Sequence, residues 1–190
     1  MLRWIIALSI VLAAGPGMAQ SYSRADLVRG LCRKDGCDEF SIVEKQPVAQ
    51  SDQGALYRTR VRTYHASHQG RVEQGEENGF VFCSPVRPAV ITDQDGQALA
   101  FLLAPQAQKE ARENTNYYAL YFGLCHGLEA GRAAAQDWRG VARSLGYEVP
   151  LTQSRLVTLK RAEEIMESRS REGTAARSSE VASQQPTISR

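Results

Sequence analysis

Residues 114–131 constrain the fold of this 190-residue chain more than any other stretch. Plotted at 100° per residue, their large apolar side chains fill roughly 200° of a helix circumference. A surface helix has a narrower apolar stripe, so this pattern predicts a helix packed between a sheet and other helices. Ala119, Gly123, Gly127 and Gly131 recur every four residues within the stretch. This row of small residues predicts that a second backbone packs closely against the helix.

The first residues have the pattern of a secretory signal peptide. Arg3 gives a short basic start, residues 4–14 form an apolar run, and Gly17 and Ala19 fit the small-residue positions of a cleavage site. We therefore predict a signal peptide over residues 1–19 and a periplasmic or secreted protein. An uncleaved membrane anchor is the alternative, although the run is short for a membrane span. After cleavage, we expect no integral membrane segment.

Four cysteines in an exported chain predict two disulfide bonds. Among the three possible pairings, we prefer Cys32–Cys37 and Cys83–Cys125. Asp35 and Gly36 supply a turn between the first two cysteines. The second pair joins an apolar strand to the helix of residues 114–131. A metal site is the alternative, but the spacing lacks the paired C-x-x-C motifs that structural zinc sites use.

Alternating apolar and polar residues predict several strands after the first cysteine pair. The predicted strands are residues 40–48, 55–67, 79–84, 89–92 and 97–104. The last two are expected to form a hairpin. The charged residues 70–79 are expected to form a loop. Residues 23–31 begin with an S-x-x-D pattern, which predicts a short N-terminal helix.

Two further helices are predicted after residues 114–131. Trp138, Val141 and Leu145 recur at helical spacing within residues 133–145, and residues 152–167 have a similar pattern. We therefore expect an α+β fold with an antiparallel sheet of about four or five strands, three C-terminal helices packed on one face and a short N-terminal helix. Residues 20–167 are predicted to form a single domain, and the polar residues 168–190 a disordered tail.

A row of arginines, Arg58, Arg60 and Arg62, is the sharpest surface feature of the sequence. On a strand these side chains project from one face, where they could bind carboxylates or phosphates bidentately. The alternative is a solvated face whose arginines pair with Glu44 or with the acidic residues of 70–79. The net charge of +2 gives no indication of a nucleic-acid partner.

The three histidines do not form a recognisable site. His65 and His68 have the spacing of a ligand pair on a helix, but on a strand they face opposite sides. Cys125 and His126 would make a nucleophile pair only if Cys125 were a free thiol. No nucleotide-binding, hydrolase or metalloprotease motif occurs, and no metal or cofactor is predicted.

These patterns favour an exported, disulfide-bonded domain that binds an unknown protein or a small anionic ligand, with no catalytic residue assigned. The arginine row of residues 58–62 is the predicted anion site. The alternative is a hydrolase or transferase whose site is assembled from distant residues. For that alternative, His65, His126 and a loop glutamate are the candidates.

Overall fold

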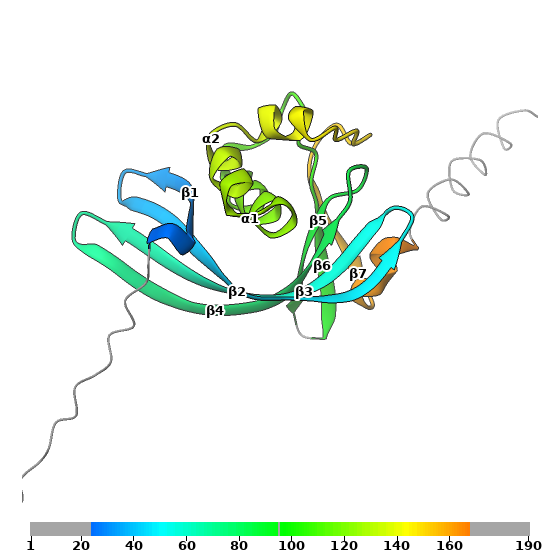
Figure 1. Cartoon of the computed structure of the whole chain (residues 1–190), viewed down its shortest axis with the longest axis horizontal. Coiled ribbons are helices and arrows are strands. Elements are labelled where there is room, and N and C mark those ends of the chain that lie inside the picture. The colour runs from blue at the N-terminus through cyan, green and yellow to red at the C-terminus, as the bar shows by residue number, and fades with distance from the viewer. Residues whose placement is uncertain (1–23, 95, 168–190) are drawn as a thin grey trace, which may run out of the picture.

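The computed structural model describes residues 24–94 and 96–167, and its framework is a single curved antiparallel sheet (Figure 1). The seven strands lie in sequence order, so each strand pairs with its sequence neighbours. They are β1 (Leu27–Arg33), β2 (Gly36–Ser51), β3 (Gly54–Ser67), β4 (Gly70–Cys83), β5 (Ala89–Gln94), β6 (Gln97–Leu102) and β7 (Arg155–Leu159). The predicted signal peptide and tail lie outside the described residues.

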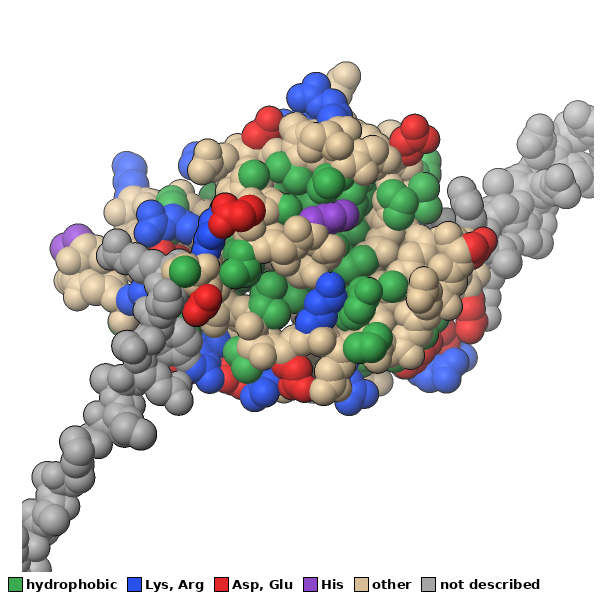
Figure 2. All heavy atoms as spheres, in the orientation of Figure 1, with side chains coloured by type: hydrophobic (Ala, Val, Ile, Leu, Met, Phe, Trp, Pro, Cys, Tyr) green, Lys and Arg blue, Asp and Glu red, His purple; other side chains and the backbone are tan. Residues whose placement is uncertain are grey.

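Two α-helices, α1 (Thr115–His126) and α2 (Leu128–Ser144), lie inside the curve of the sheet (Figure 1). Three short 3-10 helices complete the fold: η1 (Arg24–Asp26), η2 (Arg112–Asn114) and η3 (Ala162–Met166). Figure 2 shows that hydrophobic side chains gather in the middle of one face, over the helices and adjoining strands. Most charged side chains in that view lie nearer its margin.

Alternate side chains of the central strands enter two different hydrophobic clusters. Tyr57, Val81 and Val90 belong to the cluster that includes the buried residues of α1 and α2. Leu56, the residue before Tyr57 in β3, and Phe82, the residue after Val81 in β4, pack instead in a cluster with η3. Because successive strand residues point to opposite faces, the sheet separates these two cores.

A bulge in β2 adapts the sheet to the end of α1. The register shifts between Ile42 and Glu44, so β2 carries one residue more than β3 at this point. Lys45 thereby faces the helices, and its Nζ donates a hydrogen bond to the Leu124 carbonyl at 2.6 Å. This cation lies at the carboxyl end of α1, where the helix dipole favours positive charge.

The predicted fold, with four or five strands and three C-terminal helices, is wrong. The sheet has seven strands and is accompanied by two α-helices. Residues 23–31 were expected to be helical, but most of them form β1, whose pairing with β2 buries Leu27, Val28 and Leu31. Residues 152–167 form β7 and η3, because Leu156–Leu159 pairs along β6. In both places sheet pairing outweighs a helix-like spacing of apolar residues.

The predicted loop of residues 70–79 is also a strand. This segment forms the first part of β4, where most residues are exposed. Its charged side chains interact across the sheet, as in the ion pair of Glu76 with Arg62 on β3. The helices do not cover this part of β4, so it has no apolar face. Without an apolar face, its sequence lacks the alternation that predicts a strand.

The predicted helix of residues 114–131 is broken near its end. Gly127 has a φ of +92° and separates α1 from α2. The predicted close packing is confirmed at Gly131, where an added Cβ would lie 2.8 Å from both the Ala119 oxygen and the Gly123 Cα, but not at Gly127, where an added Cβ would have nothing within 4 Å. The second backbone is therefore that of α2, packed against α1. The predicted hairpin of β5 and β6 is confirmed as well.

Candidate functional site

An open pocket with a volume of about 430 Å³ is lined by edge strand β1, by η2, α1 and α2, and by one residue each of β2 and β4. Most of its polar lining is cationic, and Leu27, Leu31 and Ala135 supply apolar lining. We call it the cationic pocket, after its charged lining residues Arg29, Arg71, Arg112, Arg132 and Glu39. A second depression of about 420 Å³ shares Arg29 and Arg71 with this pocket and has no other charged lining residue.

Glu39 holds two of these arginines. Its Oε1 accepts a hydrogen bond from Arg29 Nε at 3.0 Å, and its Oε2 accepts one from Arg71 Nε at 2.7 Å. Both contacts use Nε, so the terminal nitrogens of the two guanidinium groups are not occupied by Glu39. Among the described residues, no other side chain or carbonyl bonds those terminal nitrogens. Glu39 therefore orients both guanidinium groups through Nε, and their terminal N–H groups are still available for hydrogen bonding.

The Glu39 carboxylate is almost completely buried, with 2% of its side chain exposed. Burial alone would raise its pKa, but the hydrogen bonds from Arg71 and Arg29 outweigh that effect and hold the pKa below its ordinary value. Glu39 is thus negatively charged at neutral pH, while both arginines are positively charged. One carboxylate compensates only one of the two guanidinium charges.

The other two arginines of the cationic pocket differ in their contacts. Arg132 donates from Nε to the Leu27 carbonyl at 3.0 Å and also bonds Ala25 and Glu129. Its guanidinium therefore ties the start of β1 to α2. Arg112, in η2, is exposed, and its side chain has no ion pair or hydrogen bond within the described residues. It is consequently the pocket arginine most open to a ligand.

The predicted arginine row lies on β3, away from the cationic pocket. Arg60 lies 3.1 Å from Glu76 and 3.3 Å from Glu44, and Arg62 also pairs with Glu76. Arg58 has no carboxylate partner among the described residues. Carboxylates thus already occupy two members of the row. The row as an anion site stays a prediction that binding measurements must decide.

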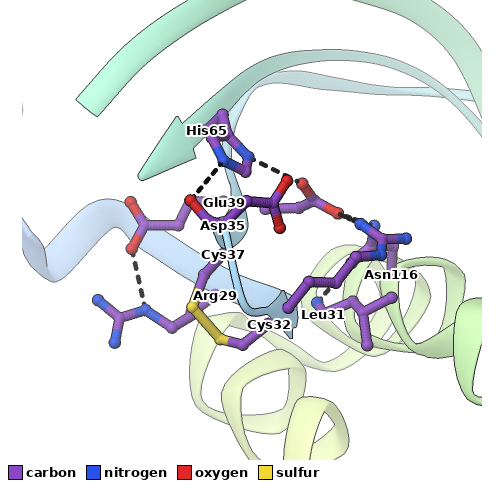
Figure 3. The surroundings of a disulfide bond; sticks show 10 residues. Arg29, Leu31, Cys32, Asp35, Cys37, Glu39, His65 and Asn116 are labelled. Atoms are coloured by element: carbon purple, nitrogen blue, oxygen red, sulfur yellow. Dashed lines mark hydrogen bonds and ion pairs between the residues drawn. A yellow bond between two sulfur atoms is a disulfide. The ribbon is translucent and has the colours of Figure 1, made fainter. Parts of the chain in front are cut away.

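Both predicted cysteine pairs form disulfide bonds. Cys83 joins β4 to Cys125 on α1, and Cys32 joins β1 to Cys37 on β2. The shorter bridge lies beside the cationic pocket, because Cys32 belongs to its lining; Figure 3 shows it close to Arg29 and Glu39. Two disulfides are consistent with a periplasmic or extracellular location.

Asn116, in the first turn of α1, fixes the helix against β1 and β2 (Figure 3). Its Oδ1 accepts a hydrogen bond from the Leu31 amide at 2.6 Å, and its Nδ2 donates to Asp38 at 2.8 Å. Gly30 allows this approach, since a Cβ there would lie 2.2 Å from the Asn116 side-chain oxygen. These contacts hold α1 against β1, and both elements contribute lining residues to the cationic pocket.

No family model, curated protein or solved structure matched this chain.

The two histidines of the enzymatic alternative lie near opposite ends of α1. His65 contacts Asp38, which bonds Asn116 at the start of the helix. His126 is the last residue of α1, and a rise of 1.5 Å per residue separates it from Asn116 by about 15 Å. The structure therefore does not bring His65 and His126 together.

His126 ends a buried chain of hydroxyl groups. Its Nε2 lies 2.6 Å from the Tyr147 hydroxyl, which lies 3.0 Å from the hydroxyl of Tyr121. Burial raises the pKa of Tyr147 to about 12, so this hydroxyl is neutral at physiological pH. Burial and the nearby Lys45 ammonium lower the pKa of His126. These hydrogen bonds give partners to the buried polar groups between α1 and the residues after α2.

The described residues also bear on membranes and metals. Across residues 24–94 and 96–167, neither α-helix has the length and apolar character needed to cross a membrane. Over the same ranges, no group of three His, Cys, Asp or Glu side chains has the arrangement of a metal site.

Sequence reasoning missed Arg29, Glu39, Arg71 and Arg112 as members of one site. Residues 23–31 were predicted to be helical and residues 70–79 to be a loop, so Arg29 and Arg71 could not be placed on adjacent parts of a sheet. A usable signal was present in the Asp-Gly turn between Cys32 and Cys37. That turn indicates a β-hairpin, in which Arg29 and Glu39 become cross-strand neighbours.

Proposed function

We propose that the protein is an exported binding domain that holds a small anionic ligand in the cationic pocket. The observation that carries this proposal is the contact of Glu39 with the Nε atoms of both Arg29 and Arg71. A single buried carboxylate orients two guanidinium groups and leaves their terminal N–H groups for another partner. Arginine forks of this kind bind carboxylates and phosphates through paired hydrogen bonds.

The setting of these arginines also supports binding. Because Glu39 already fixes Arg29 and Arg71, a ligand would not have to order these long side chains, which reduces the entropic cost of association. The 430 Å³ volume lies in the range of small-molecule sites. The Cys32–Cys37 bridge and the Asn116 hydrogen bonds hold the walls in place. The predicted export and the disulfides together support a role outside the cytoplasm.

Replacement of Arg112 by Gln tests this proposal without breaking any internal ion pair. Titration calorimetry of the purified protein with inorganic phosphate, citrate and phenyl phosphate should detect at least one bound anion. Arg112→Gln should weaken that binding about tenfold or more, because it removes a charge-assisted hydrogen bond of about 1.5–3 kcal/mol. Binding should also weaken as salt rises from low to physiological ionic strength.

Arg58→Gln is the matched control, since it makes the same charge change at another exposed arginine. It should leave the affinity within about twofold of the wild type, as expected for a screened charge outside the site. Arg71→Lys gives a further check. Lysine can keep the ion pair with Glu39, but it lacks the planar pair of terminal N–H groups with which arginine binds an anion. If Arg58→Gln lost binding and Arg112→Gln kept it, the anion site would lie on the β3 row and the proposal would be contradicted.

A further inference from the structure

We propose that the ligand of the cationic pocket is a phosphate monoester with a compact apolar body. This inference rests on the proposed function and adds the chemical class of the ligand. Three features of the pocket point to it: the charge that its residues leave uncompensated, its size, and the apolar side chains beside the arginines.

The uncompensated charge matches a doubly charged anion. Arg132 bonds Glu129 and two backbone carbonyls, so its charge is already compensated. Arg29, Arg71 and Arg112 face one carboxylate, that of Glu39, and this leaves a local charge of +2. A phosphate monoester carries close to two negative charges at neutral pH, on oxygens that accept from several arginine forks at once. Acetate or a sulfate ester carries one.

The size and lining of the pocket call for more than a bare phosphate. A volume of about 430 Å³ far exceeds the space that one phosphate group fills. Beside the arginines, the half-buried Ala135 of α2 and the accessible edges of the buried Leu27 and Leu31 of β1 form the apolar part of the lining. Burial of an apolar body against these side chains would add affinity that inorganic phosphate cannot gain. The inferred ligand therefore has a dianionic head and a small apolar body.

The pH dependence of binding should follow the ligand, not the protein. The charged groups that face the pocket are Arg29 on β1, Glu39 on β2, Arg71 on β4, Arg112 in η2 and Arg132 on α2. Arginine side chains stay protonated between pH 5.5 and pH 7.5. Glu39 stays ionised over the same range, because its pKa lies below the ordinary value. A phosphate monoester loses its second charge near pH 6. Binding should therefore weaken between pH 7.5 and pH 5.5.

Titration calorimetry with phenyl phosphate, phenyl sulfate, inorganic phosphate and phthalate tests this inference on the purified protein. At pH 7.5, phenyl phosphate should bind about tenfold more tightly than phenyl sulfate, which has the same body and one charge less. It should also bind about tenfold more tightly than inorganic phosphate, which has no apolar body. The advantage over phenyl sulfate should fall to about threefold at pH 5.5, where roughly a quarter of the phosphate ester keeps its second charge. Arg112→Gln should weaken phenyl phosphate binding, and Arg58→Gln should not.

The outcomes separate this inference from the proposed function. Equal affinity at pH 7.5 for phenyl phosphate and phenyl sulfate, or for phenyl phosphate and inorganic phosphate, would overturn the ligand class. The proposed function would still stand if the binding were weaker in Arg112→Gln. Phthalate binding as tight as phenyl phosphate would assign the pocket to dicarboxylates and overturn it as well. If no probe bound with a dependence on Arg112, both proposals would fail.

Discussion

At the scale of single residues, Glu39 is the side chain that organises the cationic pocket. It is buried and charged, and it holds Arg29 and Arg71 from opposite sides through its two oxygens. A buried carboxylate without such partners would be protonated instead. The two ion pairs therefore support each other through one acid, so a change at Glu39 should affect both walls of the pocket.

Glu39→Gln should alter how stability depends on pH. The folded-state pKa of Glu39 lies below its unfolded value, so its contribution is present above the unfolded pKa near 4.5 and is lost as pH falls through the folded pKa. At pH 7 the substitution should lower the free energy of unfolding by about 1–3 kcal/mol. The deficit should shrink when urea denaturation is repeated near pH 3.

Glu44→Gln is the control, because Glu44 forms an exposed pair with Arg60. Its effect should stay within about 1 kcal/mol at neutral pH. If the deficit of Glu39→Gln were the same at pH 7 and pH 3, the stabilising role assigned to the Glu39 charge would be wrong.

At the scale of elements, the contact between α1 and α2 explains the row of small residues. Gly131 has backbone atoms of Ala119 and Gly123 within 3.0 Å of where a Cβ would stand. At Gly123, by contrast, the nearest atoms to an added Cβ are 3.6 Å away, which is ordinary van der Waals contact. The two glycines face each other but differ in how much space surrounds them.

Gly131→Ala and Gly123→Ala should therefore have opposite effects. The first forces the helices apart and should cost about 1–3 kcal/mol. The second meets no clash and should be neutral or stabilising by up to about 1 kcal/mol, from helix propensity. Thermal and urea denaturation of the two variants would decide, and equal destabilisation would contradict the close contact at Gly131.

The two disulfides also differ as elements of stability. The bridges span sequence separations of 42 residues for Cys83–Cys125 and 5 residues for Cys32–Cys37. The chain-entropy estimate gives about 4 kcal/mol for the longer loop and about 2 kcal/mol for the shorter one. Alanine replacement of both cysteines in each pair, followed by urea denaturation, should give this order. The reverse order would show that loop length does not set their contributions.

The sequence predicted some of these elements and missed others for identifiable reasons. The hairpin of β5 and β6 was predictable because it has clear alternation and a turn. Residues 70–79 of β4 were missed because both faces meet solvent and carry charge. β7 was missed because its apolar residues also fit a helical spacing. The break at Gly127 was missed because the apolar residues on both sides of it fit one continuous helix.

At the scale of the whole molecule, a curved sheet of seven strands brings distant residues into one site. Arg29, Glu39, Arg71 and Arg112 come from four different elements. Further lining residues come from α1 and α2, the helices that lie inside the curve of the sheet (Figure 1). Such a site depends on pairing order and register, so it could not be predicted once β1 and the first part of β4 had been misassigned. The β3 arginine row needed only one strand, which is why the sequence revealed it.

The β3 row should matter little for stability. Its ion pairs with Glu76 and Glu44 are exposed, and pairs of this kind contribute about 0–1 kcal/mol each. Replacement of Arg58, Arg60 and Arg62 by Gln should leave the melting temperature nearly unchanged. A large fall in melting temperature, measured by circular dichroism, would show that the pairs are structurally important after all.

The most direct test of the account is to locate the bound anion by nuclear magnetic resonance. Phenyl phosphate added to the ¹⁵N-labelled protein should produce saturable shifts of the amides of Gly30 and Leu31 on β1, Arg71 on β4 and Thr115 on α1, which all line the cationic pocket. The same titration of Arg112→Gln should need a higher ligand concentration for the same shifts. Shifts centred on the β3 row, or no saturable shift at any amide, would contradict the proposal that this pocket binds an anion.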